Sequence, residues 1–412
     1  MEHLGVREAL GIILESVFVA DVETVMLEQS LGRVLAEAVS ANRDLPPYDV
    51  SAMDGFAVRS ADVANAPAQL AIIEDIRAGD MPTKTVQAGQ CARIMTGAPV
   101  PQGADAVIRV EDTRDLSAGK VEILQAVKSG SDIRLQGEGM KNGDVVLQAG
   151  TEITPGVVGV LATVKAARFA VYRRPRVAIL STGDELEGMH DPVDPKKIPN
   201  SNSYALMAQV QALGIEPVLL GIARDDPVEL EQYLRRGLEY DVLLVSGGTS
   251  VGVHDYVRPT IEKLGVQMKF WRVAIKPGHP LAFGTTNNTL VFGLPGNPVS
   301  SMVCFEEFVI PALRRRMGNQ RLYRRSVQAR LGHAVKFRPG RTEFIRVHLR
   351  HDAAGYIASS TGSQSSGALL SMAKADGLLV VPSDSTGLAE GEQVTVQLLD
   401  GMVFQDAIEF RE

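Results

Sequence analysis

The chain has 412 residues, of which 45% are hydrophobic and 22% charged, and its formal net charge at pH 7 is −7. At roughly 100 to 200 residues per domain, this length predicts about three domains or four small ones. The acidic balance argues against nucleic acid or an anionic membrane as the main partner, because both bind basic surfaces.

The two cysteines, Cys91 and Cys304, are far apart and form no C-x-x-C pattern. This argues against a disulfide framework or a zinc site and makes the cytoplasm the expected location. The first eight residues carry acids and lack the apolar core of a signal peptide. No run of about 18 apolar residues occurs, so we expect no membrane-spanning helix.

The first 175 residues combine helical and β-rich patterns. Apolar residues at helical spacing predict an amphipathic helix over 4–18, and residues 25–38 are either a second helix or a connector. Residues 42–144 alternate short apolar runs with turn residues, which is typical of a β-rich domain. A helix is predicted over 154–166, with Pro155 at its start and Thr154 as a possible N-cap. Residues 42–144 would then be inserted into a helical stalk formed by 1–41 and 145–175.

From residue 176 to 321 strands alternate with helices, as in a parallel α/β sheet. Residues 322–412 return to β character and predict a small β-barrel. The expected strands of the α/β region are 177–180, 218–222, 242–245 and 290–292, and the expected helices are 201–213, 227–239, 255–264 and 299–317.

The loops that follow these four strands are the candidate site, because ligands bind beyond the carboxyl ends of parallel strands. Two of the loops are acidic and two are rich in glycine, which lets backbone N–H groups approach a phosphate. In order, the loops are Ser181-Thr-Gly-Asp-Glu185, Ala223-Arg-Asp-Asp226, Ser246-Gly-Gly-Thr-Ser-Val-Gly252 and Gly293-Leu-Pro-Gly-Asn-Pro298.

The acids in these loops would repel one another if they converged. Two unit charges about 4 Å apart interact by roughly 4 kcal/mol near a protein surface, so a cation is expected, and hard oxygen ligands suggest Mg²⁺. Lys276 offers a charge for an oxyanion. A purely structural interpretation stays open: Asp226 could cap the helix that begins at Pro227, and Gly247-Gly248 could only permit a sharp turn. The acids are Asp184, Glu185, Asp225, Asp226 and Asp255.

Gly248-Thr-Ser-Val-Gly252 also matches the G-x-S-x-G motif of serine hydrolases. In those enzymes the serine stands directly at a strand-to-helix turn. Here the strand is expected to end near Val245, several residues before Ser250, and no apolar helix follows. A serine hydrolase is therefore kept only as the last alternative.

Together, these motifs resemble the molybdopterin molybdenumtransferases, which include bacterial MoeA and the C-terminal region of gephyrin. The resemblance covers nearly the whole chain in the order of the family. It rests on the runs Ser51-Ala-Met-Asp-Gly-Phe-Ala-Val58, Met95-Thr-Gly-Ala-Pro99, Ser181-Thr-Gly-Asp-Glu185, Ser246-Gly-Gly-Thr-Ser-Val-Gly252 and Gly293-Leu-Pro-Gly-Asn-Pro-Val-Ser300.

The resemblance implies that the α/β region, 176–321, is a molybdopterin-binding domain beside the stalk, the insertion and the barrel. It implies an elongated homodimer in which the α/β domain of one subunit faces the β insertion of the other. The implied reaction takes molybdate and adenylylated molybdopterin with Mg²⁺, hydrolyses the adenylate, releases AMP and leaves molybdenum on the dithiolene. An adenylyltransferase is the implied supplier of the substrate.

Site residues also follow from the resemblance. The implied catalytic residues are Asp54, Thr96, Glu185, Asp226, Asp255 and Lys276, and Glu185, Asp226 and Asp255 are the implied metal ligands. The implied cofactor-binding residues are Ser181, Thr182, Gly183, Ser246, Gly247, Gly248, Ser250, Pro295, Gly296, Asn297, Pro298, Ser365 and Ser366.

Two positions depart from the family pattern. Gly139 stands where many relatives carry an aspartate, and His279 stands where many bacterial members carry a second lysine. Both departures fall at the implied anion and metal site. They leave open a catalytically weak paralogue, a protein tuned to tungstate, or a gephyrin-like scaffold.

Overall fold

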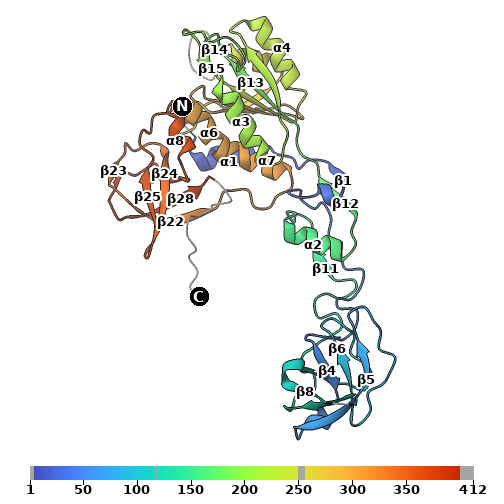
Figure 1. Ribbon diagram of the computed structural model, residues 1–412. Coiled ribbons are helices and arrows are strands. Elements are labelled where there is room, and N and C mark those ends of the chain that lie inside the picture. The colour runs from blue at the N-terminus through green and yellow to red at the C-terminus, as the bar shows by residue number, and fades with distance from the viewer. Residues whose placement is uncertain (1–3, 117, 249–255, 400–412) are drawn as a thin grey trace. The chain divides into compact units, whose positions relative to one another are not determined.

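The computed structural model describes residues 4–116, 118–248 and 256–399 (Figure 1). The chain divides into one unit of residues 1–36, 150–154 and 170–412 and a second unit of residues 37–149 and 155–169. Ser250 and Asp255 lie outside the described residues.

The second unit contains a six-stranded sheet in the order β7-β4-β6-β5-β9-β8. Every pair in it is antiparallel except β5 with β6. Alternate residues pack on opposite faces: Phe56 and Val58 belong to one core and Ala57 to another. The predicted β character is therefore confirmed. The strands are β4 (Gly55–Val58), β5 (Ala68–Ile76), β6 (Gln90–Ile94), β7 (Ala106–Arg109), β8 (Thr113–Leu116) and β9 (Lys120–Ile123).

Two of the early helices agree with the sequence and one does not. Helix α1 (Val6–Glu15) and helix α2 (Pro155–Thr163) form where expected. The helical interpretation of residues 25–38 is wrong. That region holds the end of β1 (Val22–Met26), a short 3-10 turn and a left-handed Gly32 with φ 73°. A residue with positive φ ends a helix, and β1 pairs with β12 (Arg168–Tyr172) instead.

The α/β sheet of the first unit has the order β16-β13-β17-β21-β20-β18. Its first four strands are parallel, as predicted. Two further strands, β20 (Ala282–Thr285) and β18 (Gln267–Phe270), were not predicted and run antiparallel. The four parallel strands are β13 (Val177–Thr182), β16 (Val218–Ala223), β17 (Val242–Ser246) and β21 (Leu290–Leu294).

Both faces of this sheet are covered by helices, so its strands are continuous apolar runs. Side chains of α1, α3 (Ser201–Gln211), α6 (Pro298–Cys304) and α7 (Ile310–Arg316) pack with one face. Side chains of α4 (Pro227–Gly237) and α5 (Val257–Lys263) pack with the other. The helix expected over 299–317 is interrupted by a π-helical turn, Phe305–Val309. Pro311 follows it and has no N–H to donate to the preceding turn.

The C-terminal strands close into a barrel because the long strand β24 (Thr342–Asp352) pairs with both β25 (Gly355–Ser360) and β26 (Gly377–Val381). Strands β22 (Ser326–Leu331) and β28 (Gln393–Leu398) complete it. The two-residue strand β19 (Ile275–Lys276) also pairs with β24, in parallel. None of the helices in the described ranges is long and apolar enough to cross a bilayer.

Candidate functional site

Polar side chains gather at the carboxyl ends of the central strands. The register places Ser181 of β13 beside Ser246 of β17, and Ser246 beside Leu294 of β21. The Ser181 hydroxyl donates to Asn200 Oδ1 at 2.9 Å. Asn202 Nδ2 donates to Ser246 Oγ and to the Gly296 carbonyl, both at 2.8 Å. The start of α3 thus ties together the loops after three strands.

The two asparagines were missed at the sequence level. Asn200 is the N-cap of α3 and accepts a bond from the Ser203 N–H. Its position directly before a predicted helix was an available N-cap signal. Asn202 gave no such signal, because its role depends on strands that are distant in the chain.

The glycine-rich loop after β17 fits tightly against β13. Gly247 and Gly248 have φ of 93° and 62°, and a Cβ on Gly247 would lie 2.6 Å from the Thr182 carbonyl oxygen. A Cβ on Gly248 would lie 2.1 Å from a methyl group of Val257. Glycine is therefore required at both positions. Beside this loop, the buried Thr182 hydroxyl has no hydrogen-bond partner among the described residues, so it is available to a ligand.

The two acidic loops meet at the same edge of the sheet. Asp225 N–H donates to Asp184 Oδ1 at 3.2 Å. The Asp184 carbonyl accepts bonds from Lys197 Nζ and Arg224 Nη1. The exposed Glu185 carboxylate lies over Gly183, where a Cβ would be 2.4 Å from its Oε2.

Asp226 is the N-cap of α4. Its Oδ1 accepts the Val228 and Glu229 N–H groups at 3.0 and 2.8 Å, so the capping interpretation holds. Its other oxygen makes no hydrogen bond to the described residues and stays available. Within the described ranges no three His, Cys, Asp or Glu side chains form a group suited to a metal, and Asp255 is outside those ranges. The exposed oxygens of Glu185 and Asp226 are hard donors of the kind that Mg²⁺ accepts.

A second part of the site is cationic. Lys276 Nζ lies 3.0 Å from Glu343 Oε2, at a cavity of about 240 Å³ that His333, Lys336 and Arg346 also line. The Arg346 guanidinium is almost fully buried, which lowers its pKa, and it donates to the Ser365 carbonyl at 3.1 Å. Arg346 and Glu343 were missed at the sequence level, because their positions depend on how β24 closes the barrel.

The loop that contains Ser365 and Ser366, called the serine loop below, connects the cationic cavity to the sheet edge. The Ser366 carbonyl accepts the Val299 N–H at 3.1 Å, directly after Pro298, the first residue of α6. Pro295 and Gly296 form the loop between β21 and this helix, and Asn297 is its N-cap. His279, the departure from the family lysine, is partly buried, and its Nδ1 lies 2.8 Å from the Val273 carbonyl.

Asp54 and Thr96 form a pair within the second unit. Asp54 Oδ1 accepts the Thr96 N–H at 2.7 Å and the Thr96 hydroxyl at 2.8 Å. The backbone bond first, and then the hydroxyl bond, hold the pKa of Asp54 below its usual value. Asp54 is therefore an exposed, charged carboxylate, directly before β4.

Three family descriptions match successive parts of the chain. A MoeA N-terminal region (domain I and II) matches residues 4–164, a probable molybdopterin binding domain matches 178–315, and a MoeA C-terminal region (domain IV) matches 328–399. A molybdopterin molybdenumtransferase of Nostoc sp. is 38% identical over 387 residues, which cover 91% of this chain and 88% of the relative. One of Staphylococcus epidermidis is 33% identical over 410 residues and 98% of both chains.

The fold agrees with these sequence matches. A solved structure of the molybdopterin biosynthesis MoeA protein from Pyrococcus horikoshii OT3 superposes with a TM-score of 0.83. It is 32% identical in sequence, and the match covers 96% of this chain and 100% of that one. The chain belongs to the molybdopterin molybdenumtransferase family.

Proposed function

We propose that the chain is an enzyme that transfers molybdenum from molybdate to molybdopterin, and that it takes the adenylylated pterin with Mg²⁺ and releases AMP. One observation carries the proposal: the strand-end loops and the cationic cavity are joined by the serine loop at Val299. These bonds would connect the proposed phosphate site with the proposed oxyanion site. The similar proteins named molybdopterin molybdenumtransferase support the choice of the pterin and of molybdate as substrates.

The phosphate part of the substrate suits the glycine-rich edge. The loop at Gly247 brings backbone against Thr182, whose unpartnered hydroxyl can donate to a phosphate oxygen. Helix α6 begins beside this loop, and a helix N-terminus stabilises negative charge. Asn202 holds Ser246 and Gly296 in place for the ligand.

The acidic loops and Lys276 have separate roles. Glu185, Asp226 and Asp255 would hold Mg²⁺, which when bound neutralises phosphate charge. The Lys276 ammonium, together with Arg346 of the same lining, attracts molybdate into the cavity of about 240 Å³. Water enters the phosphoanhydride as its P–O bond breaks, and AMP leaves. The two dithiolene sulfurs then bind molybdenum, and one oxo group of molybdate leaves with the two thiol protons as water.

The assembly is part of the same proposal. We propose a homodimer whose chains each comprise a stalk (1–41 and 145–175), an insertion (42–144), an α/β domain (176–321) and a barrel (322–412). In this dimer Asp54 of one chain acts with Glu185 of the other. A cytoplasmic adenylyltransferase supplies the substrate.

The deciding experiment measures AMP release from adenylylated molybdopterin, with molybdate, in the presence and absence of Mg²⁺. Release that depends on both supports the proposal. A purified, folded protein that releases no AMP would instead be a scaffold. Faster turnover with tungstate than with molybdate would identify a tungsten enzyme. Labelling of Ser250 by a fluorophosphonate would favour the hydrolase.

Two substitutions at Asp226 separate its capping role from its role in the reaction. Asparagine can still accept the Val228 and Glu229 N–H groups, whereas alanine cannot. We expect Asp226→Asn and Asp226→Ala both to lower AMP release by about tenfold or more, or about 1.4 kcal/mol. Only the alanine variant should also lose about 1 kcal/mol of unfolding free energy. Full activity in the asparagine variant would remove Asp226 from the metal site.

A substitution at Gly139 tests whether the carboxylate that many relatives carry at this position is needed for the reaction. Its φ is not positive, and an added Cβ would meet the Leu45 carbonyl oxygen at 3.1 Å, a contact that a small shift relieves. We therefore expect Gly139→Asp to fold and to raise the rate of molybdenum insertion. Gly139→Asn is the matched control, since it adds the same bulk without charge. Equal rates in the native chain and both variants would mean that the missing carboxylate does not limit the reaction.

A further inference from the structure

A second polar cavity lies at the opposite edge of the α/β sheet, where β13, β17 and β21 begin. Its volume is about 760 Å³. Arg176 directly precedes β13 and Asp241 directly precedes β17, so a full strand separates this cavity from the strand-end loops. At about 3.3 Å per residue that is roughly 17 Å. Its polar lining includes Arg173, Arg176, Asp241, Lys269, Thr286 and Arg316.

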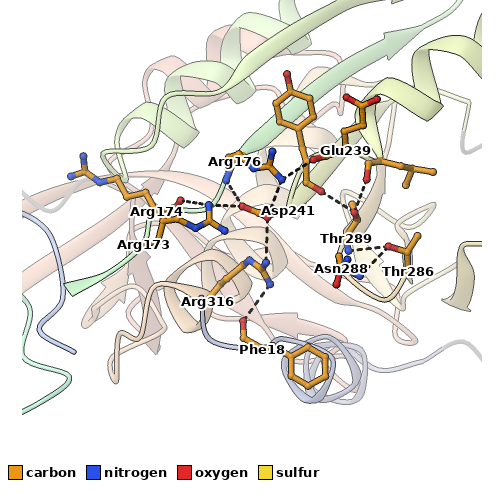
Figure 2. Close-up of polar contacts among 12 residues, drawn as sticks. Phe18, Arg173, Arg174, Arg176, Glu239, Asp241, Thr286, Asn288, Thr289 and Arg316 are labelled. Carbon is orange, nitrogen blue, oxygen red and sulfur yellow. Dashed lines mark hydrogen bonds and ion pairs between the residues drawn. The ribbon is translucent and has the colours of Figure 1, made fainter. Parts of the chain in front are cut away.

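Three arginines converge on one buried carboxylate (Figure 2). Asp241, whose side chain is 9% exposed, lies 2.9 Å from Arg173 Nη1, 3.5 Å from Arg176 Nη2 and 3.6 Å from Arg316 Nη2. One carboxylate cannot neutralise three guanidinium groups. The positive charge of Arg173 contributes, after burial, to lowering the pKa of Arg316.

The cluster also has more donors than acceptors. A guanidinium carries five N–H donors. Arg173 uses only Nη1 in hydrogen bonds with the described residues, to Asp241 and the Arg174 carbonyl. Arg316 donates from Nη1 to the Phe18 carbonyl at 3.3 Å, and its buried Nε has no partner among the described residues. A ligand rich in acceptor oxygens would satisfy donors that the fold leaves over.

Other groups of the lining set the charge and size of the ligand. The exposed Lys269 adds a fourth cation to the lining, and the exposed carboxylates of Asp21 and Glu15 offset part of the total positive charge. The Phe18 side chain is 73% exposed and also lines the cavity. The volume exceeds that of a single oxyanion, and the ring offers an apolar surface for the rest of a small molecule.

We propose that this cavity binds a small phosphate ester, with its phosphate group between Arg173, Arg176 and Arg316. Arginine forks match phosphate oxygens in pairs, which favours a phosphate over a halide or a single carboxylate. The site is independent of the proposed catalytic function, because it shares no residue with the strand-end loops or the cavity at Lys276.

Binding is tested with inorganic phosphate and with AMP at constant ionic strength, by calorimetry together with hydrogen exchange read by mass spectrometry. Both measurements use the Lys276→Ala variant, because this substitution should weaken anion binding at the proposed catalytic cavity. We expect both probes to slow exchange in residues 15–21 and 285–290. AMP should bind at least threefold more tightly than phosphate, since its base can lie against Phe18. Slower exchange only in residues 181–185 and 246–248 would overturn the proposal.

The phosphate affinities of substituted chains then show whether the lining residues of this cavity bind the phosphate. Arg176→Gln with Lys269→Gln removes two exposed cations of the lining and should weaken phosphate binding at least tenfold. Arg235→Gln with Lys263→Gln is the matched control, because it removes the same charge from exposed residues that pair with Glu231 elsewhere. Arg316→Lys keeps the charge but loses the fork, and should weaken binding without unfolding the chain. Equal affinity in the lining and control variants, or binding only at molar phosphate, would refute the site.

Discussion

Chains that carry Asp54→Ala and chains that carry Glu185→Ala are expected to recover activity when they are co-expressed as mixed dimers, although each pure variant is nearly inactive. The proposed dimer takes Asp54 from one subunit and Glu185 from the other. A two-fold mixed dimer then has one doubly damaged site and one intact site, so it should retain about half of the native activity. Sites formed within one chain would all be damaged.

The experiment needs two different affinity tags and sequential purification, so that only mixed dimers are assayed for AMP release. Asp54 suits the test because its side chain is exposed and, among the described residues, its carboxylate bonds only to Thr96, so the loss of this side chain should not disturb the core. A mixed dimer of Asp54→Ala with Asp226→Asn should recover in the same way. The control combines Glu185→Ala with Asp226→Asn, which damages the same half-site in both chains and should stay inactive. Mixed dimers as inactive as their parents would exclude the shared site.

Glu307→Gln is expected to stabilise the protein at alkaline pH. Glu307 lies in the π-helical turn between α6 and α7, and its Oε1 accepts Gln397 Nε2 at 2.8 Å. Burial first, and then the charge of Glu306, raise the pKa of Glu307 to about 8. The folded protein therefore holds a proton that the unfolded chain releases near pH 4.5. The free energy of unfolding should fall by up to about 1.4 kcal/mol per pH unit between these values.

A glutamine at this position keeps the acceptor for Gln397 and has no proton to lose. The difference in unfolding free energy between variant and native chain should be small at pH 5 and reach roughly 2 to 4 kcal/mol in favour of the variant at pH 8. Denaturant titrations at both pH values measure it. Glu306→Gln is the control with the opposite sign, because it removes the ion pair with Arg324 at 2.9 Å. A constant difference across the pH range would contradict the raised pKa.

The sequence predicted the parallel strands because both their faces are buried, which makes them short apolar runs such as Val177–Leu180. It also placed the acidic loops at the ends of parallel strands, where ligands bind, but left open whether their carboxylates converge. The antiparallel strands β18 and β20 were missed because Ala282-Phe-Gly-Thr285 has no distinctive pattern. The two possible roles of Asp226 could not be separated, since a cap and a metal ligand need the same residue type.

Residues whose roles depend on contacts with distant parts of the chain could not be predicted from the sequence. Asn202 contacts Ser246 and Gly296, which are 44 and 94 positions away. Arg346 becomes part of the site only when the barrel closes and buries it below the serine loop. No local spacing encodes such contacts. The family motifs found the loops, and tertiary packing decided which neighbouring side chains complete them.

Strand β19 limits how this protein can be divided or recombined. Its two residues, Ile275 and Lys276, lie within the α/β segment of the chain but pair with β24 of the barrel. A truncation before residue 322 would leave that backbone unpaired and remove Glu343 from Lys276. A chimera with the barrel of a relative would have to match the register of Ile275 with Thr342. The α/β segment and the barrel should therefore be exchanged or truncated together in protein engineering. A cut between them along the chain would separate strands that pair in the fold.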